Sequence, residues 1–281
     1  MDGTAPAFAL RMSDHPLFAA LAPYRDLLAS QDLDRMSHLL AEQAGAPLHF
    51  VPQTASLLED GLHYERRIAE LGLIATRPSN THDLFNAAIW LQHSAIKRAM
   101  NRRQAADITR VGPKQRTRGQ CALTHFDEAG AIVWLADREL VDAWDAHDWP
   151  RLFLRHRDAW GRGIAVTVIG HALLDYALVH DTAPVAKALA VAVSGGEIAH
   201  RCAGSAVIAS WPEAERAIAA DIDAARRLAD PQELRPLPLA GIPGWSGVEQ
   251  SETFYASAPC FRPLRAGRRY PPPLAFGEAM M

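Results

Sequence analysis

The sequence predicts a helix-rich, single-domain α+β fold with a small sheet. Most of the first 230 residues carry apolar side chains at helical spacing. Residues 121–135 and 163–169 instead contain alternating or β-branched apolar runs, which indicate a hairpin and a buried strand. From Pro231 onward, proline and glycine are too dense for a helix or an inner strand, so we expect an irregular C-terminal arm.

Helical spacing is clearest in the N-terminal part of the chain. We expect helices over residues 16–30, 32–44, 63–72 and 80–104, with a short extended segment over residues 47–53. Gly72 is suited to end the third helix. Asn80 or Thr81 is the natural N-cap of the fourth, and His93 is expected on the surface of that helix.

The rest of the chain is expected to mix strands and helices. We expect, in order, a basic loop over 105–119, the hairpin over 121–135 with its turn at 127–130, one or two helices over 137–160, a strand over 163–169 that runs into a helix after Gly170, a strand or helix end over 187–194, and a helix over 211–229. Trp245, Tyr255 and Phe261 make the later arm too apolar to be disordered. We therefore expect three parts: a main domain (1–230), an ordered arm packed on it (231–270) and a mobile tail (271–281).

The composition is that of an ordinary globular protein. The 281 residues suffice to bury a core without disulfides, and the net charge of −3 gives no global field that would favour nucleic acid or a membrane. The three cysteines lie far apart and are odd in number, which argues against a disulfide framework. Neither a signal-peptide core nor a run of roughly 20 apolar residues is visible in the sequence. We therefore expect a soluble cytoplasmic protein, and its preference for arginine over lysine is typical of GC-rich bacterial genomes.

Motifs of several common enzyme classes are missing. The sequence contains no GxGxxG after a strand, no GxxxxGK followed by Ser or Thr, no HExxH and no GxSxG. Nucleotide-cofactor enzymes and serine hydrolases are therefore poorly supported.

The first candidate site lies at the start of the helix near residue 80. His82 and Asn86 fall on one face of this helix, and Asp83 lies in its first turn, where the helix dipole favours a carboxylate. An imidazole and an amide on one face suit a metal or a polar substrate. The alternative is purely structural, with the same side chains capping the helix and bonding a neighbouring loop.

Two further candidates follow the predicted strands. His171 and Asp175 lie one helical turn apart just after the strand over 163–169, where α/β proteins often place sites, and the spacing suits two ligands of one metal. Asp127 and Glu128 are adjacent at the expected hairpin turn and suit a cation or acid–base work. Turn chemistry alone would also explain an aspartate there.

The segment from Lys97 to Arg118 is the strongest charge asymmetry in the chain. It carries eight basic side chains, opposed only by Asp107. Arg116 and Arg118 lead into the expected hairpin and suit an anionic ligand. A solvated helix end, or binding of nucleic acid, would explain the same charges.

Together these segments resemble the bacterial family catalogued as domain of unknown function 3025. The resemblance rests on GAPLHFVPQ, YERRI, TRPSNTHDLFNAAIW, ALTHFDEAG, GHALLD, PLPLAGIPGW and FRPLR, in this order, and covers roughly residues 15–265. The family has no established activity, so the resemblance implies kinship without a reaction. It places the polar candidates inside recognisable motifs, which favours a site. Thr81 stands where the family usually has Trp, and Asp175 where Glu is expected, which puts a ligand role for Asp175 in doubt.

The sequence therefore predicts an enzyme of hydrolytic or acid–base type, with a site formed by His82, Asp83, Asn86, Asp127, Glu128 and His171. A divalent metal held by His82, His171 and Asp175 would assist it, and Arg116 or Arg118 would hold a small anionic substrate. Two alternatives stay open. The same residues could form a buried polar network in a non-catalytic binding or scaffold protein, or the basic segment 97–118 could bind nucleic acid.

Overall fold

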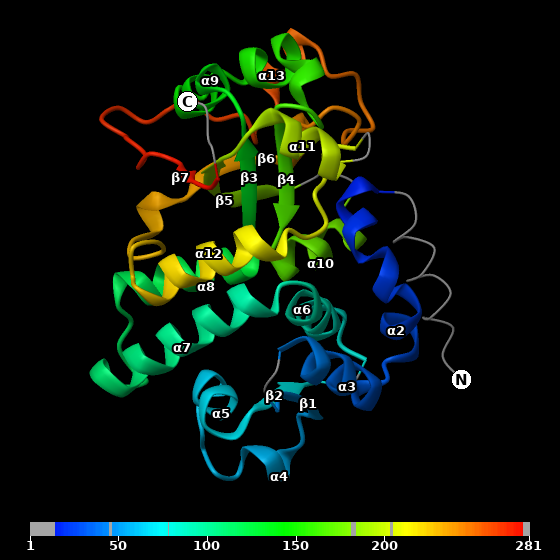
Figure 1. The fold of residues 1–281 in the computed structure, drawn as a ribbon, viewed down its shortest axis with the longest axis vertical. Helices are drawn as coiled ribbons and strands as arrows, with labels where there is room; N and C mark the ends of the chain where they lie inside the picture. Colours follow the sequence, from blue (N-terminus) through cyan, green and yellow to red (C-terminus); the bar gives the residue numbers. More distant parts are fainter. Residues whose placement is uncertain (1–14, 45–46, 78, 181–183, 203–204, 278–281) are drawn as a thin grey trace.

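A mixed five-stranded sheet lies at the centre of the computed structural model, with helices packed around it and a second, two-stranded sheet at the far end (Figure 1). The structure describes residues 15–44, 47–77, 79–180, 184–202 and 205–277. The predicted helix-rich α+β fold is confirmed. None of the helices in these ranges combines the length and apolarity needed to cross a membrane.

The five-stranded sheet has the order β4-β3-β5-β6, with β7 beside β5. Its strands are β3 (Gly130–Leu135), β4 (Ile164–Val168), β5 (Val185–Ala192), β6 (Arg235–Pro238) and β7 (Leu274–Ala275). β3 runs antiparallel to β4 and parallel to β5, while β6 pairs antiparallel with β5. Every residue of β3 and β4 is buried, so both strands belong to the hydrophobic core although β4 lies at one end of the strand order. The strand predicted over 163–169 is confirmed by β4.

Helices make up most of the remaining chain, and several follow the predicted boundaries closely. The elements of the first part are a 3-10 helix (Pro16–Tyr24), α2 (Arg25–Ser30), α3 (Leu33–Ala44), β1 (His49–Pro52), α4 (Ala55–Leu58), α5 (Tyr64–Leu71), β2 (Leu73–Thr76), α6 (Thr81–Gln92) and α7 (Ser94–Val111). Those of the second part are α8 (Arg118–Ala129), α9 (Arg138–Asp145), a π-helical turn (Pro150–Arg155), α10 (His171–Val179), α11 (Gly195–Cys202), α12 (Pro212–Asp223) and α13 (Glu252–Ser257). β1 and β2 pair in parallel to form the second sheet.

The predicted hairpin over 121–135 is wrong in its first half, which is the helix α8. Thr117 and Gln120 form a reciprocal capping box that starts this helix. Leu123 and Phe126 are then buried at helical spacing. Only residues from Gly130 onward form a strand, so Asp127 and Glu128 lie in the last turn of a helix and not in a hairpin turn.

The helix predicted over 80–104 also differs from the structure, because it breaks and then runs further. His93 leaves the helical conformation between α6 and α7, and α7 continues to Val111, through the first part of the predicted basic loop over 105–119. His93 is buried and not on the surface as expected. Its Nδ1 lies 3.1 Å from Oε2 of the buried Glu215 on α12. This buried pair ties the break in the long helix to the neighbouring helix.

The C-terminal arm contributes to the core. It supplies β6 at the edge of the sheet and buries Trp245, Tyr255 and Phe261. The short helix α13 forms within it although the composition was expected to exclude helix, because Ser251 caps its first turn. Within the segment predicted to be a mobile tail, β7 pairs with β5, and residues 278–281 lie outside the described residues.

Replacement of Glu215 by glutamine is expected to lower the free energy of unfolding by about 3 kcal/mol at neutral pH, because it removes a buried carboxylate that faces His93 and accepts hydrogen bonds from Ser210 and Trp211. Burial would raise the pKa of Glu215, but His93 and the hydrogen bonds from Trp211 and Ser210 outweigh it and lower this pKa. A lowered folded-state pKa gives stability that is present above the unfolded pKa of about 4.3 and is lost as the pH falls through the folded pKa.

Urea unfolding of both proteins at neutral and acidic pH tests this, and the difference between them should shrink on acidification. Glu213→Gln is the matched control, because Glu213 lies on the same helix but is exposed. It should change the stability by no more than about 0.5 kcal/mol. Equal stability of the two variants would contradict the prediction.

Candidate functional site

A polar pocket of about 330 Å³ opens between α5, α6, α7, α8 and α10. Four carboxylates line it, from Glu65, Asp83, Asp127 and Glu128. Its basic lining residues are Arg77, Arg116, His63, His82 and His171. Most of the residues predicted to form a site therefore share one pocket, although they come from distant parts of the chain.

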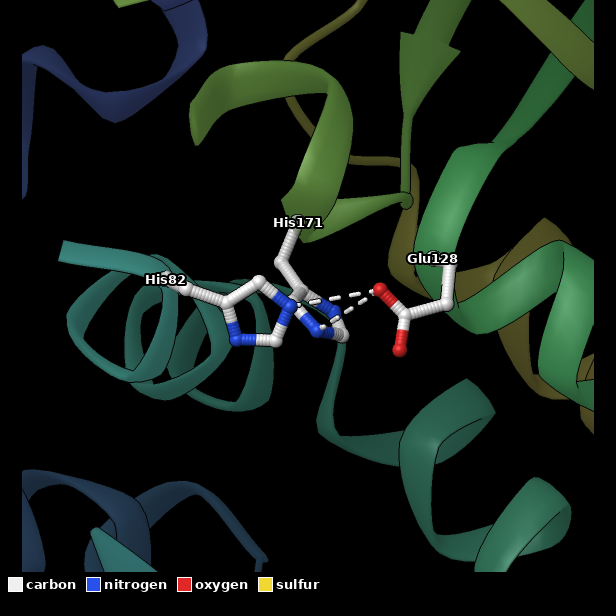
Figure 2. A group of neighbouring side chains, drawn as sticks. All are labelled: His82, Glu128 and His171. Carbon is white, nitrogen blue, oxygen red and sulfur yellow. Dashed lines mark hydrogen bonds and ion pairs between the residues drawn. The ribbon is translucent and has the colours of Figure 1, made fainter. Parts of the chain in front are cut away.

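Three side chains converge at this pocket, as Figure 2 shows: His82 from the first turn of α6, Glu128 from the last turn of α8 and His171 from the start of α10. Oε2 of Glu128 lies 3.3 Å from Nε2 of His82 and 3.6 Å from Nε2 of His171. The two imidazole rings meet edge to face, with their centres 4.4 Å apart. One ligand atom from each residue lies within 4.8 Å of the other two, which is close enough for all three to hold one ion.

Two glycines place Glu128 and His171 side by side. Gly170 precedes α10, and a Cβ atom on it would lie 2.4 Å from the backbone nitrogen of Gly130 and 2.5 Å from Cα of Ala129. The carbonyl oxygen of Gly130 accepts hydrogen bonds from the backbone N–H groups of Ile169 and Gly170. The backbones of the end of α8 and the start of α10 touch here, which only glycine permits. Glu128, two residues before Gly130, and His171, directly after Gly170, therefore line the same pocket.

The carboxylate of Asp83 orients the imidazole ring of His82. Its Nδ1 lies 3.3 Å from Oδ1 of Asp83, which leaves Nε2 to face Glu128. These hydrogen bonds to Asp83 and Glu128 raise the pKa of His82 to about 9. Asp83 is fixed in turn by the guanidinium and backbone N–H of Arg77. Burial alone would raise the pKa of Asp83, but the bonds from Arg77 and His82 hold it well below its usual range.

His171 differs from His82 in its surroundings. Its side chain is only 3% exposed, against 34% for His82 and 45% for Glu128. Burial lowers the pKa of His171 to about 4, so its imidazole is neutral at physiological pH and has a free lone pair. Its Nδ1 is buried without a hydrogen-bond partner among the described residues. The site thus has one deeply buried neutral imidazole and two ligand groups that the pocket leaves accessible.

A buried lysine organises the wall beside this trio. Lys97 is 4% exposed, and its ammonium donates to Oδ1 of Asp127 and to Oδ1 of Asn86. Asn86 donates in turn to the hydroxyl of Tyr64 at 3.0 Å. Burial would raise the pKa of Asp127, but the charge of Lys97 and its hydrogen bond to this carboxylate lower it. Asp127 and Asn86 therefore belong to a satisfied polar network next to the trio.

Glu65 is a pocket residue to which the sequence assigned no role. Burial, reinforced by the negative charge of Asp127, raises the pKa of Glu65 to about 7. Its Oε2 accepts a hydrogen bond of 2.6 Å from Nδ2 of Asn101. Glu65 lies in the YERRI segment, which carries the family resemblance but gave no signal of a titratable group in a pocket.

Two residues predicted to belong to the site lie elsewhere. Asp175 accepts a 2.6 Å hydrogen bond from Oγ1 of Thr81 and is absent from the group of ligand atoms around His171. Arg118 pairs with Asp230 near the C-terminal arm, through contacts to both carboxylate oxygens. Arg116 alone of the two expected substrate-binding arginines lines the pocket.

Most of the basic segment 97–118 contacts other protein groups. Arg102 pairs with Asp223, Arg110 with Asp107, and Arg103 donates to backbone carbonyls of residues 227 and 228. With Lys97 buried and Arg118 paired, these contacts leave little free positive charge for nucleic acid along α7.

Gly170→Ala is expected to lower the free energy of unfolding by about 3 kcal/mol, because the added methyl group meets backbone atoms that cannot move aside. Gly163→Ala is the control, since the nearest atom to its Cβ would lie at 3.7 Å, and it should change the stability by less than about 1 kcal/mol. Thermal and urea unfolding measure both, and a Gly170→Ala protein as stable as Gly163→Ala would refute the close contact.

Comparison with known proteins identifies a family to which the chain is similar. No curated protein and no solved structure matches it. Residues 48–265 match the model of a family described as "Protein of unknown function (DUF3025)". This match covers most of the chain, so the protein belongs to the DUF3025 family.

Proposed function

We propose that the protein is a metal-dependent hydrolase in which His82, Glu128 and His171 hold one divalent cation. The observation that carries the proposal is the convergence of one ligand atom each from His82, Glu128 and His171 within 4.8 Å of one another at a polar pocket. Glu128 takes the place that the sequence assigned to Asp175. The size of the pocket suits a small molecule.

The donor set fits such a cation. Two imidazoles and one carboxylate are the protein ligands of many catalytic zinc sites, which keep a further position open for water or substrate. The pair of Asp83 and His82 matches the carboxylate–histidine arrangement that orients metal ligands. A bound divalent cation would supply Lewis-acid chemistry and an activated water.

The surrounding charges suit hydrolysis of an anionic substrate. Arg116 lines the pocket, and among the described residues its guanidinium pairs with no carboxylate. It would bind the negative group of the substrate. Glu65 shares the pocket, and its pKa of about 7 suits proton transfer near neutral pH. In this scheme the Lys97–Asp127–Asn86 network holds the wall in place and does not react.

A non-catalytic binding or scaffold protein is the second candidate. The network around Lys97 favours it, because a buried and fully paired ammonium specifies structure without chemistry. The two candidates differ in their behaviour toward metals. A scaffold has no reason to bind one, whereas the proposed hydrolase loses its function without it.

Calorimetric titration of chelator-treated protein with Zn²⁺ is expected to give one site per chain. Glu128→Gln should weaken the affinity at least about 100-fold, because an amide is a poor substitute for a carboxylate ligand. Asp175→Asn is the matched control and should leave the affinity unchanged, since Asp175 bonds Thr81. Wild-type protein without saturable Zn²⁺ binding, or equal effects of the two variants, would exclude the proposed centre and favour the scaffold.

Asp83→Asn tests the orienting carboxylate. The asparagine keeps the size of the side chain but removes the charge that fixes the His82 ring, so the affinity for Zn²⁺ should fall about 10–100-fold. The same titration measures it, with far-UV circular dichroism to confirm the fold. Unchanged affinity would mean that Asp83 serves only Arg77.

A further inference from the structure

A second cavity is lined by the C-terminal arm, by β5 and β6 of the sheet and by His125 of α8. It measures about 730 Å³, and we name it the arm pocket. Lys187 of β5 and three arginines of the arm, Arg262, Arg265 and Arg268, line it together with His125 and His147. No aspartate or glutamate is among its described lining residues, so the cavity is strongly basic in a chain whose net charge is −3.

The positive charges of the arm pocket are largely unpaired. Among the described residues, no carboxylate contacts the ammonium of Lys187 or the guanidinium groups of Arg262 and Arg265. Arg268 is held by the carbonyl oxygens of Gln232 and Leu234. Burial and the charges of the three arginines lower the pKa of Lys187. Like charges that repel one another in a cavity leave a favourable place for an anion.

The aromatic side chains near the arm pocket are already engaged. Tyr270 has Arg268 and Arg235 over its ring, at 4.6 and 5.0 Å from the ring centre. His147 stacks on Tyr270 and bonds its hydroxyl through Nε2 at 2.9 Å. Trp149 is buried and donates to the carbonyl of Arg262. Binding of single-stranded nucleic acid relies on free aromatic faces for its bases, and these rings offer none.

We propose that the arm pocket binds a small molecule that carries two or more phosphate groups. Several arginine forks and one lysine converge there, and guanidinium groups bind phosphate oxygens in pairs. The volume is in the range of small-molecule sites. This proposal does not rest on the metal-dependent hydrolase, because the two pockets share no described lining residue.

The three lysines of the chain allow a direct test in the unmodified protein. Lys97 is buried, whereas Lys114 and Lys187 are exposed and should react with an acetylating reagent. Tripolyphosphate, added to chelator-treated protein at about ten times its dissociation constant, should slow acetylation of Lys187 by about tenfold, as expected for a site blocked by mass action. Lys114 is the internal control and should react at an unchanged rate. Mass spectrometry of the digested protein reads both positions.

Two variants make the test specific. Arg262→Gln with Arg265→Gln should abolish the protection of Lys187, while Arg138→Gln, an exposed arginine of α9, should leave it intact. Glu128→Gln should also leave it intact, which separates this site from the metal site. Equal protection of Lys114, or protection that survives in the double variant, would overturn the proposal. Protection by a thymidine oligonucleotide but not by tripolyphosphate would overturn it in favour of nucleic acid.

Discussion

The backbone contact between Gly130 and Gly170 is the constraint on which the candidate site depends. The carbonyl of Gly130 receives two N–H groups there, and the ideal Cβ positions of both glycines collide with neighbouring backbone. This close approach joins the end of α8, the start of β3 and the start of α10 at one point. The last turn of α8 and the first turn of α10 therefore meet beside the sheet. Glu128 and His171 lie within a few ångströms of each other as a result. A bulkier residue at position 170 would force these elements apart, whereas one at position 130 would collide with Phe126 in the last turn of α8.

Two kinds of polar group lie side by side around this junction. The ammonium of Lys97 is enclosed, and Asp127 and Asn86 satisfy it, so that part behaves as core. Nδ1 of His171, by contrast, has no hydrogen-bond partner among the described residues, and Glu128 and His82 remain partly open to the pocket. Buried polar groups in folded proteins are normally paired. The part of the polar pocket formed by His82, Glu128 and His171, and not the part around Lys97, is therefore suited to bind a ligand.

The sequence predicted much of the helical framework, because apolar spacing reports directly on which face of a helix is buried. It also indicated His82, Glu128 and His171 through the segments that hold them. It placed these three residues in one predicted site, but its metal set contained Asp175 in place of Glu128. Spacing along one helix favoured Asp175 as the partner of His171, whereas the actual neighbour, Glu128, comes from another element. Lys97 was interpreted as part of a basic surface run, since its burial depends on tertiary packing that no local pattern records.

The short strand β6 has a consequence for the behaviour of the molecule in a crowded solution. Pro236 and Pro238 occupy every second position of this strand. The carbonyl of Pro236 accepts a hydrogen bond from the indole of Trp144, which lies outside the sheet. The outward positions of this edge thus carry no N–H donors, and one of their acceptors is occupied. A strand from another molecule finds no N–H donor there and therefore cannot form a regular ladder with this edge. Proline content that rules out an inner strand thereby protects the sheet from edge-to-edge aggregation.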